Sequence, residues 1–524
     1  MTSRHKGAIE MRDPLFDVPE DWSVGTTLDG GISIVSVAGE VDLSTAPALV
    51  AELAAQVETC PHAVVVDLGQ VSYFSSSGIN ALMEIQQHAR SRDIPLHLVT
   101  PGAHITRTLQ VAGLAENFSR HETLSDAIRV ARRAGRASMR IALVSEQASP
   151  LADDLGQGTH VAQLAAALRG LGHEVVVYTR RDDPRAPDRV RTEDGYEVVH
   201  VPAGPARRLT EDEVVPHLEE FAQFLAQRWR SRPPDIAHTH HWTSGLAAAI
   251  GSRRTWIPVV HSYNAVSAQE IQQRADVERL VARKASWVVA ASSPEASEMW
   301  RQGVRRIQVS MIPSGVDVEH FHPDGPVAAR GALQRLVTVG KFFRGTDFAD
   351  IIACLPALET VELVIAGDNP RSSTVAQELR ELAHDLGVRD RVTFAGEVPR
   401  ARMPVLLRSA DVVVCVPTAE PYGLVALQAM ACGVPVVATA VGALEDIVVH
   451  NITGLHVPPR EPRVLARTLR RLLADQTLRE ELGIAARDRV MARYARDKLG
   501  QEVLAVYERV DRAASARPDH QGSD

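Results

Sequence analysis

From residue 139 onward the chain alternates short, continuously apolar segments with amphipathic ones. The first such unit places "HVAQLAAALRGLG" between the apolar segments "MRIALVSE" and "HEVVVYT". Apolar runs of this length are typical of strands buried on both faces, and parallel strands need a crossover helix between them. Later apolar segments are "DIAHTH", "WIPVVHSY", "ASWVVAASS", "RLVTVGK", "VELVIAGD", "RVTFAGEV", "ADVVVCVP" and "VPVVATA". The pattern predicts an α/β protein with parallel sheets covered by helices.

This alternation is interrupted once, at "PSGVDVEHFHPDG", and resumes near Leu333. We therefore expect two doubly wound parallel-sheet domains, residues 139–325 and 326–512, that face each other across a cleft. Ligands of such sheets bind at the carboxyl ends of the strands. The remaining residues, 513–524, are predicted to be a disordered tail.

The region before this alternation, residues 23–135, has a different pattern. Strand-like segments are "GISIVSVAGEVDL", "HAVVVDLGQV" and "PLHLVT", and a helix is expected from Ser76 to Arg92. A last helix, "TLSDAIRVARRAGR", carries Arg129, Arg132, Arg133 and Arg136. A solvated helix end that leads into a linker explains these arginines better than a binding patch does. The region is predicted to be a separate α/β domain.

Bulk composition excludes several classes of protein. The net charge of -8 gives no attraction to nucleic acid over the whole surface. No apolar run approaches the ~20 residues of a membrane helix, and the first residues lack the apolar segment of a signal peptide. The four cysteines are scattered and form no CxxC pair of the kind that binds metal. We expect a cytoplasmic protein without a transmembrane segment and without a nucleic-acid partner.

A glycine-containing loop, "DDLGQGTH", separates the first predicted strand from its helix. Gly156 and Gly158 would let a phosphate approach the backbone at the helix N-terminus. A dinucleotide fingerprint requires a third glycine and an acidic residue about 20 positions further on. Arg180 and Arg181 stand at the end of the next strand instead. A nicotinamide-dependent oxidoreductase is therefore disfavoured.

Three further features each have a functional and a structural interpretation. The segment "HTHHW" contains His238, His240 and His241, which suggest either a metal site or residues that line a site or bond to loops; no cysteine or acid completes a metal geometry. Trp242 would stack on an acceptor sugar or fill the wall between the domains. Glu295, in "SSPEASEM", fits the first turn of a capped helix better than a catalytic role.

Several motifs of residues 139–510 together resemble one family. They are "GTHVAQLAAALRGLGHEVVVYTRRDDP", "PDIAHTHHWTSGLAA", "IPSGVDVEHFHP", "ADVVVCVPTAEPYGLVALQAMACGVPVVATAVGALEDIV" and "TGLHVPP". In this order they are similar to the family 4 retaining glycosyltransferases of the GT-B fold, which pairs two Rossmann-like domains. The resemblance implies transfer of a sugar from a nucleotide-sugar donor to a hydroxyl acceptor. It also implies retention of configuration, no metal and no cofactor besides the donor substrate.

The same resemblance implies roles for the donor-binding residues. Gly156 and Gly158 would lie beside the donor diphosphate, and Lys341 and Arg344 would neutralise it. Glu420 would lie near the sugar.

The helix after Glu420 would complete the donor site. Gly423, Leu424 and Val425 would present N–H groups to phosphate at the helix N-terminus, and Gln428 would bind the ribose.

The acceptor side would be formed by the first half. Asn264 takes the position of a family histidine there, and residues 238–245 would line the same side.

The chain departs from the family pattern at several of these positions. Leu155 replaces the first loop glycine, Asn264 replaces histidine, and Gln428 replaces the second glutamate of a pair whose first member is Glu420. The loop at 340–346 is shorter, with lysine and arginine exchanged. A catalytically degenerate protein that binds a nucleotide sugar or a partner is therefore the alternative.

The N-terminal region resembles STAS domains of the anti-sigma factor antagonist type. The resemblance lies in "GEVDLSTAPAL", "VVVDLGQVSYFSSSGINAL" and "PLHLVTPGAHITRTLQVAGL". Ser76 takes the position of the phosphorylated serine, whereas Ser75 replaces the aspartate before it. The resemblance implies a regulatory domain, read by a kinase or regulatory protein, and the alternative is that these serines only cap a helix.

Overall fold

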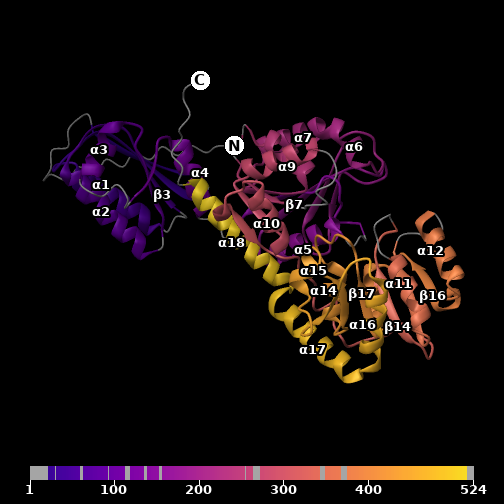
Figure 1. The fold of residues 1–524 in the computed structure, drawn as a ribbon. Coiled ribbons are helices and arrows are strands. Elements are labelled where there is room, and N and C mark those ends of the chain that lie inside the picture. Colours follow the sequence, from indigo (N-terminus) through magenta and orange to yellow (C-terminus); the bar gives the residue numbers. More distant parts are fainter. Residues whose placement is uncertain are drawn as a thin grey trace. The chain divides into compact units, whose positions relative to one another are not determined.

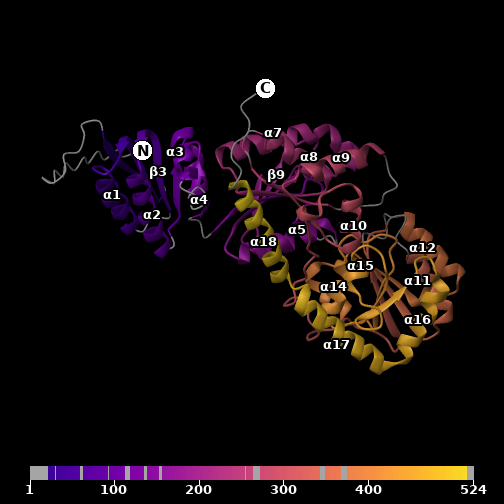
Figure 2. The ribbon, with the colours of Figure 1, turned by 60° about the vertical axis from the view of Figure 1, so that its left-hand side comes forward.

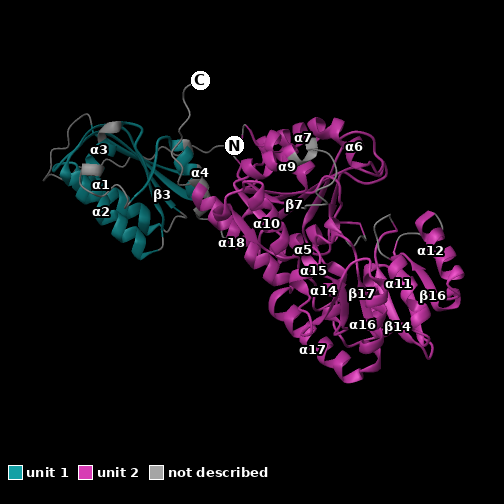
Figure 3. Ribbon diagram, viewed as in Figure 1, with its two compact units in different colours: residues 1–137, 515–524 teal, residues 138–514 magenta. Residues whose placement is uncertain are grey.

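A computed structural model describes most of the chain. The described residues are 22–29, 31–59, 63–92, 94–111, 118–134, 138–152, 156–253, 255, 257–263, 272–342, 348–367 and 374–515. They form two compact units, residues 1–137 with 515–524 and residues 138–514 (Figure 3). Each unit is described by itself.

The first unit contains a five-stranded sheet in the order β1-β2-β3-β4-β5. Its strands are β1 (Ser23–Asp29), β2 (Ile32–Val41), β3 (Ala63–Phe74), β4 (Leu96–Val99) and β5 (Ser119–His121). Only β1 is antiparallel to its neighbour. Its helices are α1 (Ala46–Glu58), α2 (Ser76–Ser91), α3 (Ala103–Val111) and α4 (Leu124–Ala134). The predicted strands and the helix from Ser76 are confirmed, whereas β1 and β5 were not predicted.

Helices α1 and α2 pack on this sheet through apolar residues at helical spacing. Leu49, Leu53 and Val57 of α1 belong to the same core as Leu82 and Ile85 of α2. Residues three or four apart share one helix face, so each helix buries one stripe. The side chains of the four arginines of the last helix lie outside the described residues.

The start of α2 is tightly built. The Ser75 hydroxyl accepts a hydrogen bond from the Ser77 N–H at 3.2 Å, so Ser75 is the N-cap. Ser76 is the first helical residue and is exposed. A Cβ on Gly78 would lie 2.9 Å from Phe74 and Val41, because the helix start lies close over the sheet. Capping therefore falls to Ser75 and leaves the Ser76 hydroxyl at the surface.

The first half of the second unit is built on an eight-stranded sheet in the order β13-β12-β11-β10-β6-β7-β9-β8, parallel except for β8. Its strands are β6 (Arg140–Val144), β7 (Glu174–Arg180), β8 (Arg189–Arg191), β9 (Glu197–Val201), β10 (Ile236–His240), β11 (Val259–Ser262), β12 (Trp287–Ala290) and β13 (Val309–Met311). Its helices include α5 (Gln157–Gly170), α6 (Glu211–Val214), α7 (Leu218–Ser231), α8 (Trp242–Gly251), α9 (Gln272–Lys284) and α10 (Ser293–Arg301).

The second half is built on a six-stranded parallel sheet in the order β16-β15-β14-β17-β18-β19. Its strands are β14 (Gln334–Val339), β15 (Val361–Ala366), β16 (Val392–Gly396), β17 (Val412–Cys415), β18 (Val436–Thr439) and β19 (Gly454–Val457). Figure 1 shows the helices α11 (Phe348–Cys354), α12 (Thr374–Asp385), α14 (Leu424–Ala431), α15 (Ala443–Ile447), α16 (Pro462–Ala474) and α17 (Gln476–Arg493) around them. The short helix α13 (Met403–Leu407) belongs to the same half. The two predicted doubly wound sheets are confirmed.

The last helix, α18 (Arg496–Ser515), returns from the second half to the first (Figures 1 and 2). Its apolar face joins the core around β6 and β7; the contributing residues are Leu499, Val503, Val506, Tyr507 and Val510. The range 326–512 therefore includes a helix whose core lies in the first half. Helix α18 also continues to Ser515, into the segment predicted as a tail, while residues from 516 on lie outside the described part.

Within the described ranges, no helix is both long enough and apolar enough to cross a bilayer.

Candidate active site

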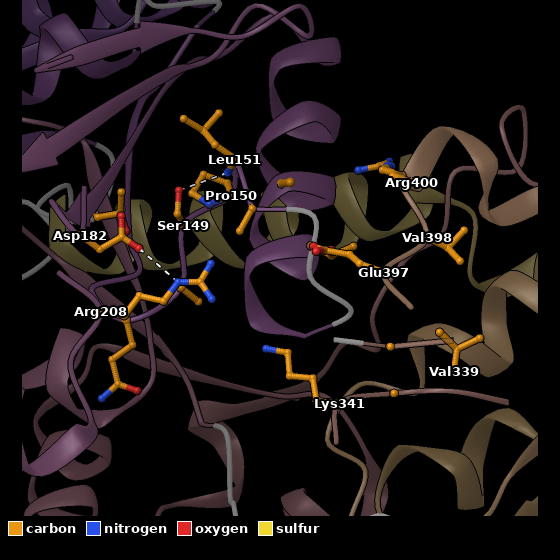
Figure 4. A pocket seen from close by; sticks show the side chains of 18 of the residues that line it. Ser149, Pro150, Leu151, Asp182, Arg208, Val339, Lys341, Glu397, Val398 and Arg400 are labelled. Atoms are coloured by element: carbon orange, nitrogen blue, oxygen red, sulfur yellow. Dashed lines mark hydrogen bonds and ion pairs between the residues drawn. The ribbon is translucent and has the colours of Figure 1, made fainter. Parts of the chain in front are cut away.

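A cavity of about 390 Å³ lies between the two halves of the second unit (Figure 4). The first half contributes the loop after β6, the end of β7 and the segment before α6. The second half contributes the residues that follow β14, β15 and β16. The charged and amide lining residues are Glu146, Gln147, Arg180, Asp182, Arg208, Lys341, Glu397, Arg400 and Gln428. The cavity thus lies at the carboxyl ends of both sheets, as predicted.

Two glycines line the cavity on the side of the second half, Gly340 after β14 and Gly367 after β15. A Cβ on Gly367 would lie 2.0 Å from the Gly340 carbonyl oxygen, so no other residue fits there without a shift of the backbone. The Gly340 N–H donates to the Ala366 carbonyl at 3.0 Å, which joins the ends of β14 and β15. Lys341 follows directly, and its side chain extends into the cavity toward the side of Arg208 (Figure 4). Arg344 lies outside the described residues.

A carboxylate, that of Glu420, accepts hydrogen bonds from backbone N–H groups at the N-terminus of α14. Glu420 Oε1 accepts hydrogen bonds from the N–H groups of Gly423 at 2.9 Å and Tyr422 at 3.2 Å. Desolvation raises the pKa of Glu420, and these two hydrogen bonds oppose the rise. Gly423 is the N-cap, with a φ of 65°. The Gly423 N–H, predicted to face phosphate, is thus donated to Glu420 in this structure, and Glu420 does not line the cavity.

Gln428 lies in α14, eight residues after Glu420, and lines the cavity. Its side chain is buried, and Oε1 has no hydrogen-bond partner among the described residues. A buried amide oxygen without a donor costs about 1–3 kcal/mol. The position therefore suits a ligand that brings a hydroxyl donor.

Comparison with known protein families matches both halves of this unit. Residues 156–315 match "Glycosyl transferase 4-like domain" and residues 331–489 match "Glycosyl transferases group 1". A D-inositol 3-phosphate glycosyltransferase of Xylanimonas cellulosilytica is 32% identical over 418 residues, which cover 73% of this chain and 100% of the relative. The chain belongs to the group 1, family 4-like glycosyltransferases. Residues 24–127 match "STAS domain", so this glycosyltransferase carries an N-terminal STAS domain.

Other relatives and solved structures agree with this assignment. A Kineococcus radiotolerans protein of the same name is 33% identical over 426 residues, covering 72% of this chain and 98% of the relative. Sucrose-phosphate synthase from Thermosynechococcus elongatus superposes with a TM-score of 0.66 at 28% identity, over 71% of this chain and 99% of that chain. Anabaena HepE, solved with UDP and glucose, has a TM-score of 0.57 at 18% identity, over 71% and 100%, and shows the shared GT-B fold.

The glycine loop of this glycosyltransferase lies at the start of α5. Gly156 is the N-cap and Gly158 is buried in the first turn, but neither lines the cavity. Thr159 and Ala162 of the same helix do. Leu155 and Asn264 lie outside the described residues, so the structure leaves their roles as predictions.

Two histidines of "HTHHW", His238 and His240, belong to a row of ring contacts, whereas His241 contacts Trp242 and Thr243. His238 lies between the Tyr507 hydroxyl at 2.7 Å and the Ser262 hydroxyl at 2.8 Å. His240 stacks on His238 with ring centroids 4.5 Å apart, and its edge meets His160 at 5.4 Å. Desolvation lowers the pKa of His160, His238 and His240, so they are neutral near pH 7.

This row also connects the two halves. His160 stacks on Tyr422, two residues after Glu420, at 5.0 Å between ring centroids. In the described part of the chain, no cluster of three or more histidine, cysteine or acidic side chains is placed to hold a metal ion. Independence from metal stays a prediction.

Trp242 and Glu295 both have structural roles, one in a hydrophobic core and the other at the start of a helix. Trp242 is buried against Val214 and Leu218 inside the first half, and its Nε1 donates to Glu211 at 2.7 Å. Trp242 therefore occupies neither of the two predicted locations, the acceptor site and the wall between the domains. Glu295 lies in the first turn of α10, whose N-cap is Ser292, as the capped-helix interpretation predicts.

Glu146 and Arg180 are among the cavity residues of this glycosyltransferase that were not predicted as site residues. Glu146, two residues after β6, is buried, and Arg180 Nε lies 3.5 Å from its Oε1. Desolvation raises the pKa of Glu146 to about 7, against the opposing effects of Arg180 and Thr243. Arg180 also donates to the carbonyls of Pro205 and Arg207 at 2.9 and 2.7 Å. Arg180 ends β7 and Glu146 lies two residues beyond β6, and this position at the end of an apolar strand was the available signal.

Proposed function

We propose that this glycosyltransferase transfers a sugar from a nucleoside diphosphate sugar to a hydroxyl acceptor, with retention and without a metal. The observation that carries the proposal is the shared position of Lys341 and Gln428. Lys341 is a cation at a strand end, Gln428 is a buried amide whose Oε1 has no hydrogen-bond partner among the described residues, and both line the same cavity. The Lys341 ammonium would neutralise a diphosphate, and a ribose hydroxyl would donate a hydrogen bond to Gln428 Oε1.

Charge development explains why no metal is required. As the bond between the sugar C1 and the phosphate oxygen breaks, negative charge builds on the leaving diphosphate. Lys341, together with Arg344, stabilises that charge, and fixed cations at such a place lower the barrier. Of the N–H groups predicted to face phosphate at the start of α14, those of Leu424 and Val425 would add a favourable dipole, since the Gly423 N–H is donated to Glu420. These groups supply what a divalent ion supplies elsewhere.

Retention follows if the acceptor approaches on the face from which the diphosphate leaves. A new bond then forms between C1 and the acceptor oxygen while the bond to the diphosphate breaks. The acceptor proton passes to the departing phosphate oxygen, so no protein base is needed. In this scheme Glu420 acts near the sugar and holds the turn before α14 in place.

The first half would bind the acceptor. The curated relatives are named for D-inositol 3-phosphate, a cyclic polyol phosphate, which supports a polyol or sugar hydroxyl as acceptor. Asn264 and residues 238–245 are the proposed acceptor-side residues.

The STAS domain would regulate this activity. The exposed Ser76 hydroxyl at the N-terminus of the 16-residue helix α2 suits a phosphate, because the helix dipole favours an anion there. A kinase or regulatory protein would read that state.

A second candidate function is binding of a nucleotide sugar without turnover. The observation that favours it is the neutral amide of Gln428 at the family's second glutamate position.

A panel of nucleotide sugars tests both candidates on the full-length protein. Thermal shift identifies the donor, and NMR then follows the anomeric proton of the released or transferred sugar. We expect one donor to raise Tm and its sugar to appear first in the donor's own configuration. Inverted product would contradict retention, binding without turnover would favour the second candidate, and no binding at all would refute both.

A further inference from the structure

Two oppositely charged side chains follow β16 at one end of the cavity. Glu397 comes directly after the strand and Arg400 three residues later, and both line the cavity. Figure 4 shows both side chains directed toward the side of Ser149 and Leu151. Within the described ranges, the Glu397 carboxylate and the Arg400 guanidinium form no hydrogen bond or ion pair with each other or with another side chain. Their polar atoms are thus available to a ligand.

The position of this pair fits the base of the donor, given the proposed function. Neighbouring strands lie about 4.8 Å apart, so the end of β16 is roughly 10 Å from that of β14, where Lys341 would hold the diphosphate. The strand ends are joined in one row, since the Gly367 N–H donates to the Gly396 carbonyl at 3.0 Å. A nucleotide that lies along this row therefore places its base beside Glu397 and Arg400.

We propose that Glu397 and Arg400 select a guanine base, so that the donor is a GDP-sugar. Guanine offers two adjacent N–H donors, N1–H and the N2 amino group, to a carboxylate, and the acceptors O6 and N7 to a guanidinium. The pair presents two acceptor oxygens and a fork of donors. Val398 and Met403 also line the cavity and would supply apolar surface for the ring.

Other bases match this pair less well. Uracil has a single N–H, flanked by two carbonyl oxygens, so a carboxylate that accepts from it also faces a carbonyl lone pair. Adenine and cytosine each offer one amino group beside a ring nitrogen acceptor. Two parallel hydrogen bonds to the carboxylate are therefore specific to guanine.

Calorimetry with GDP, UDP and ADP on the full-length protein tests the proposal. Each good bidentate contact discriminates by about tenfold or more between bases. We expect GDP to bind at least tenfold more tightly than UDP. In Glu397→Gln, GDP binding should weaken about tenfold while UDP binding changes little, which reduces the preference to a few-fold.

A surface variant serves as the control, and the pattern of nucleotide binding distinguishes failure of the guanine assignment from failure of the proposed function on which it rests. Glu481→Gln, on the exposed surface of α17, removes the same charge away from the cavity and should leave all three affinities unchanged. UDP binding as tight as GDP in the parent, or an unchanged preference in Glu397→Gln, would overturn the guanine assignment and leave the proposed function standing. Failure of all three nucleotides to bind would refute the proposed function itself.

Discussion

The Glu420 carboxylate accepts a hydrogen bond from the Gly423 N–H at 2.9 Å, and this bond holds the turn from which α14 starts. Gly423 can complete the turn because its φ is 65°, a left-handed conformation that glycine adopts readily. The turn places Gln428 in the cavity wall. The proposed donor site therefore depends on a glycine that need not touch the donor.

Gly423→Ala should be markedly destabilising. An added Cβ would lie 2.3 Å from Ile447 Cδ1 in addition to the strained φ, so we expect a loss of about 2–4 kcal/mol in the free energy of unfolding. Gly172→Ala is the matched control, since its φ is 90° but its Cβ would meet nothing within 4 Å. That variant should lose only about 1 kcal/mol. Equal losses in urea denaturation would show that packing against Ile447 is unimportant.

Gln428→Glu should tighten donor binding without changing which sugar is chosen. A charged acceptor contributes about 1–2 kcal/mol more than a neutral one, or roughly five- to thirtyfold in Kd. Calorimetry with one nucleotide sugar measures this. Gln163→Glu, another buried amide whose Oε1 is unsatisfied among the described residues, lies outside the cavity lining and serves as the control. Equal or weaker affinity in Gln428→Glu would show that this residue does not contact the ribose.

Glu146 should make stability depend on pH. Its pKa rises from 4.5 in the unfolded chain to about 7 in the folded protein, so the folded state holds the extra proton between these values. Stability is therefore lost as pH increases from 4.5 to 7. Relative to Glu146→Gln, the parent should lose roughly 3 kcal/mol over this window, at 1.36 kcal/mol per unit. Urea denaturation at several pH values checks this, and a pH-independent difference would contradict it.

Variants of the two serines at the start of α2 should have different effects, because Ser75 caps the helix and Ser76 is the proposed phosphorylation site. Ser75→Ala removes the N-cap and should cost about 1 kcal/mol, seen as faster hydrogen exchange of the α2 amides. Ser76→Ala should change exchange little, because its exposed hydroxyl is not the cap. Intact mass of protein from its native cells should show a phosphate that only Ser76→Ala removes. If no phosphate appears under any growth condition, the regulatory interpretation fails.

The two sheets could be predicted because strand positions are written in local patterns, and of the predicted site residues Lys341 and Gln428 line the cavity. Apolar runs fix the strands, and ligand residues of such folds follow their carboxyl ends, as Lys341 does. Gln428 was identified through the resemblance to the family, because it takes the position of the second glutamate of the motif that begins at Glu420.

Long-range pairings could not be predicted in the same way. The apolar spacing of α18 predicts a helix but does not say that Tyr507 meets His238 in the other half. Similarly, Glu146 and Arg180 lie at the ends of different strands, and only the parallel register of β6 and β7 brings them together. The histidines were ambiguous because ring stacking and metal binding use the same residue type.

The most direct test of the account is binding of a nucleoside diphosphate to the double variant Lys341→Ala/Arg344→Ala, measured by calorimetry beside the parent. If these cations hold the diphosphate of a donor in the second half, the parent binds and the variant loses at least tenfold in affinity, since charged hydrogen bonds contribute about 1.5–3 kcal/mol each. Thermal unfolding of the variant should match the parent. Unchanged affinity in a folded variant would contradict the central claim.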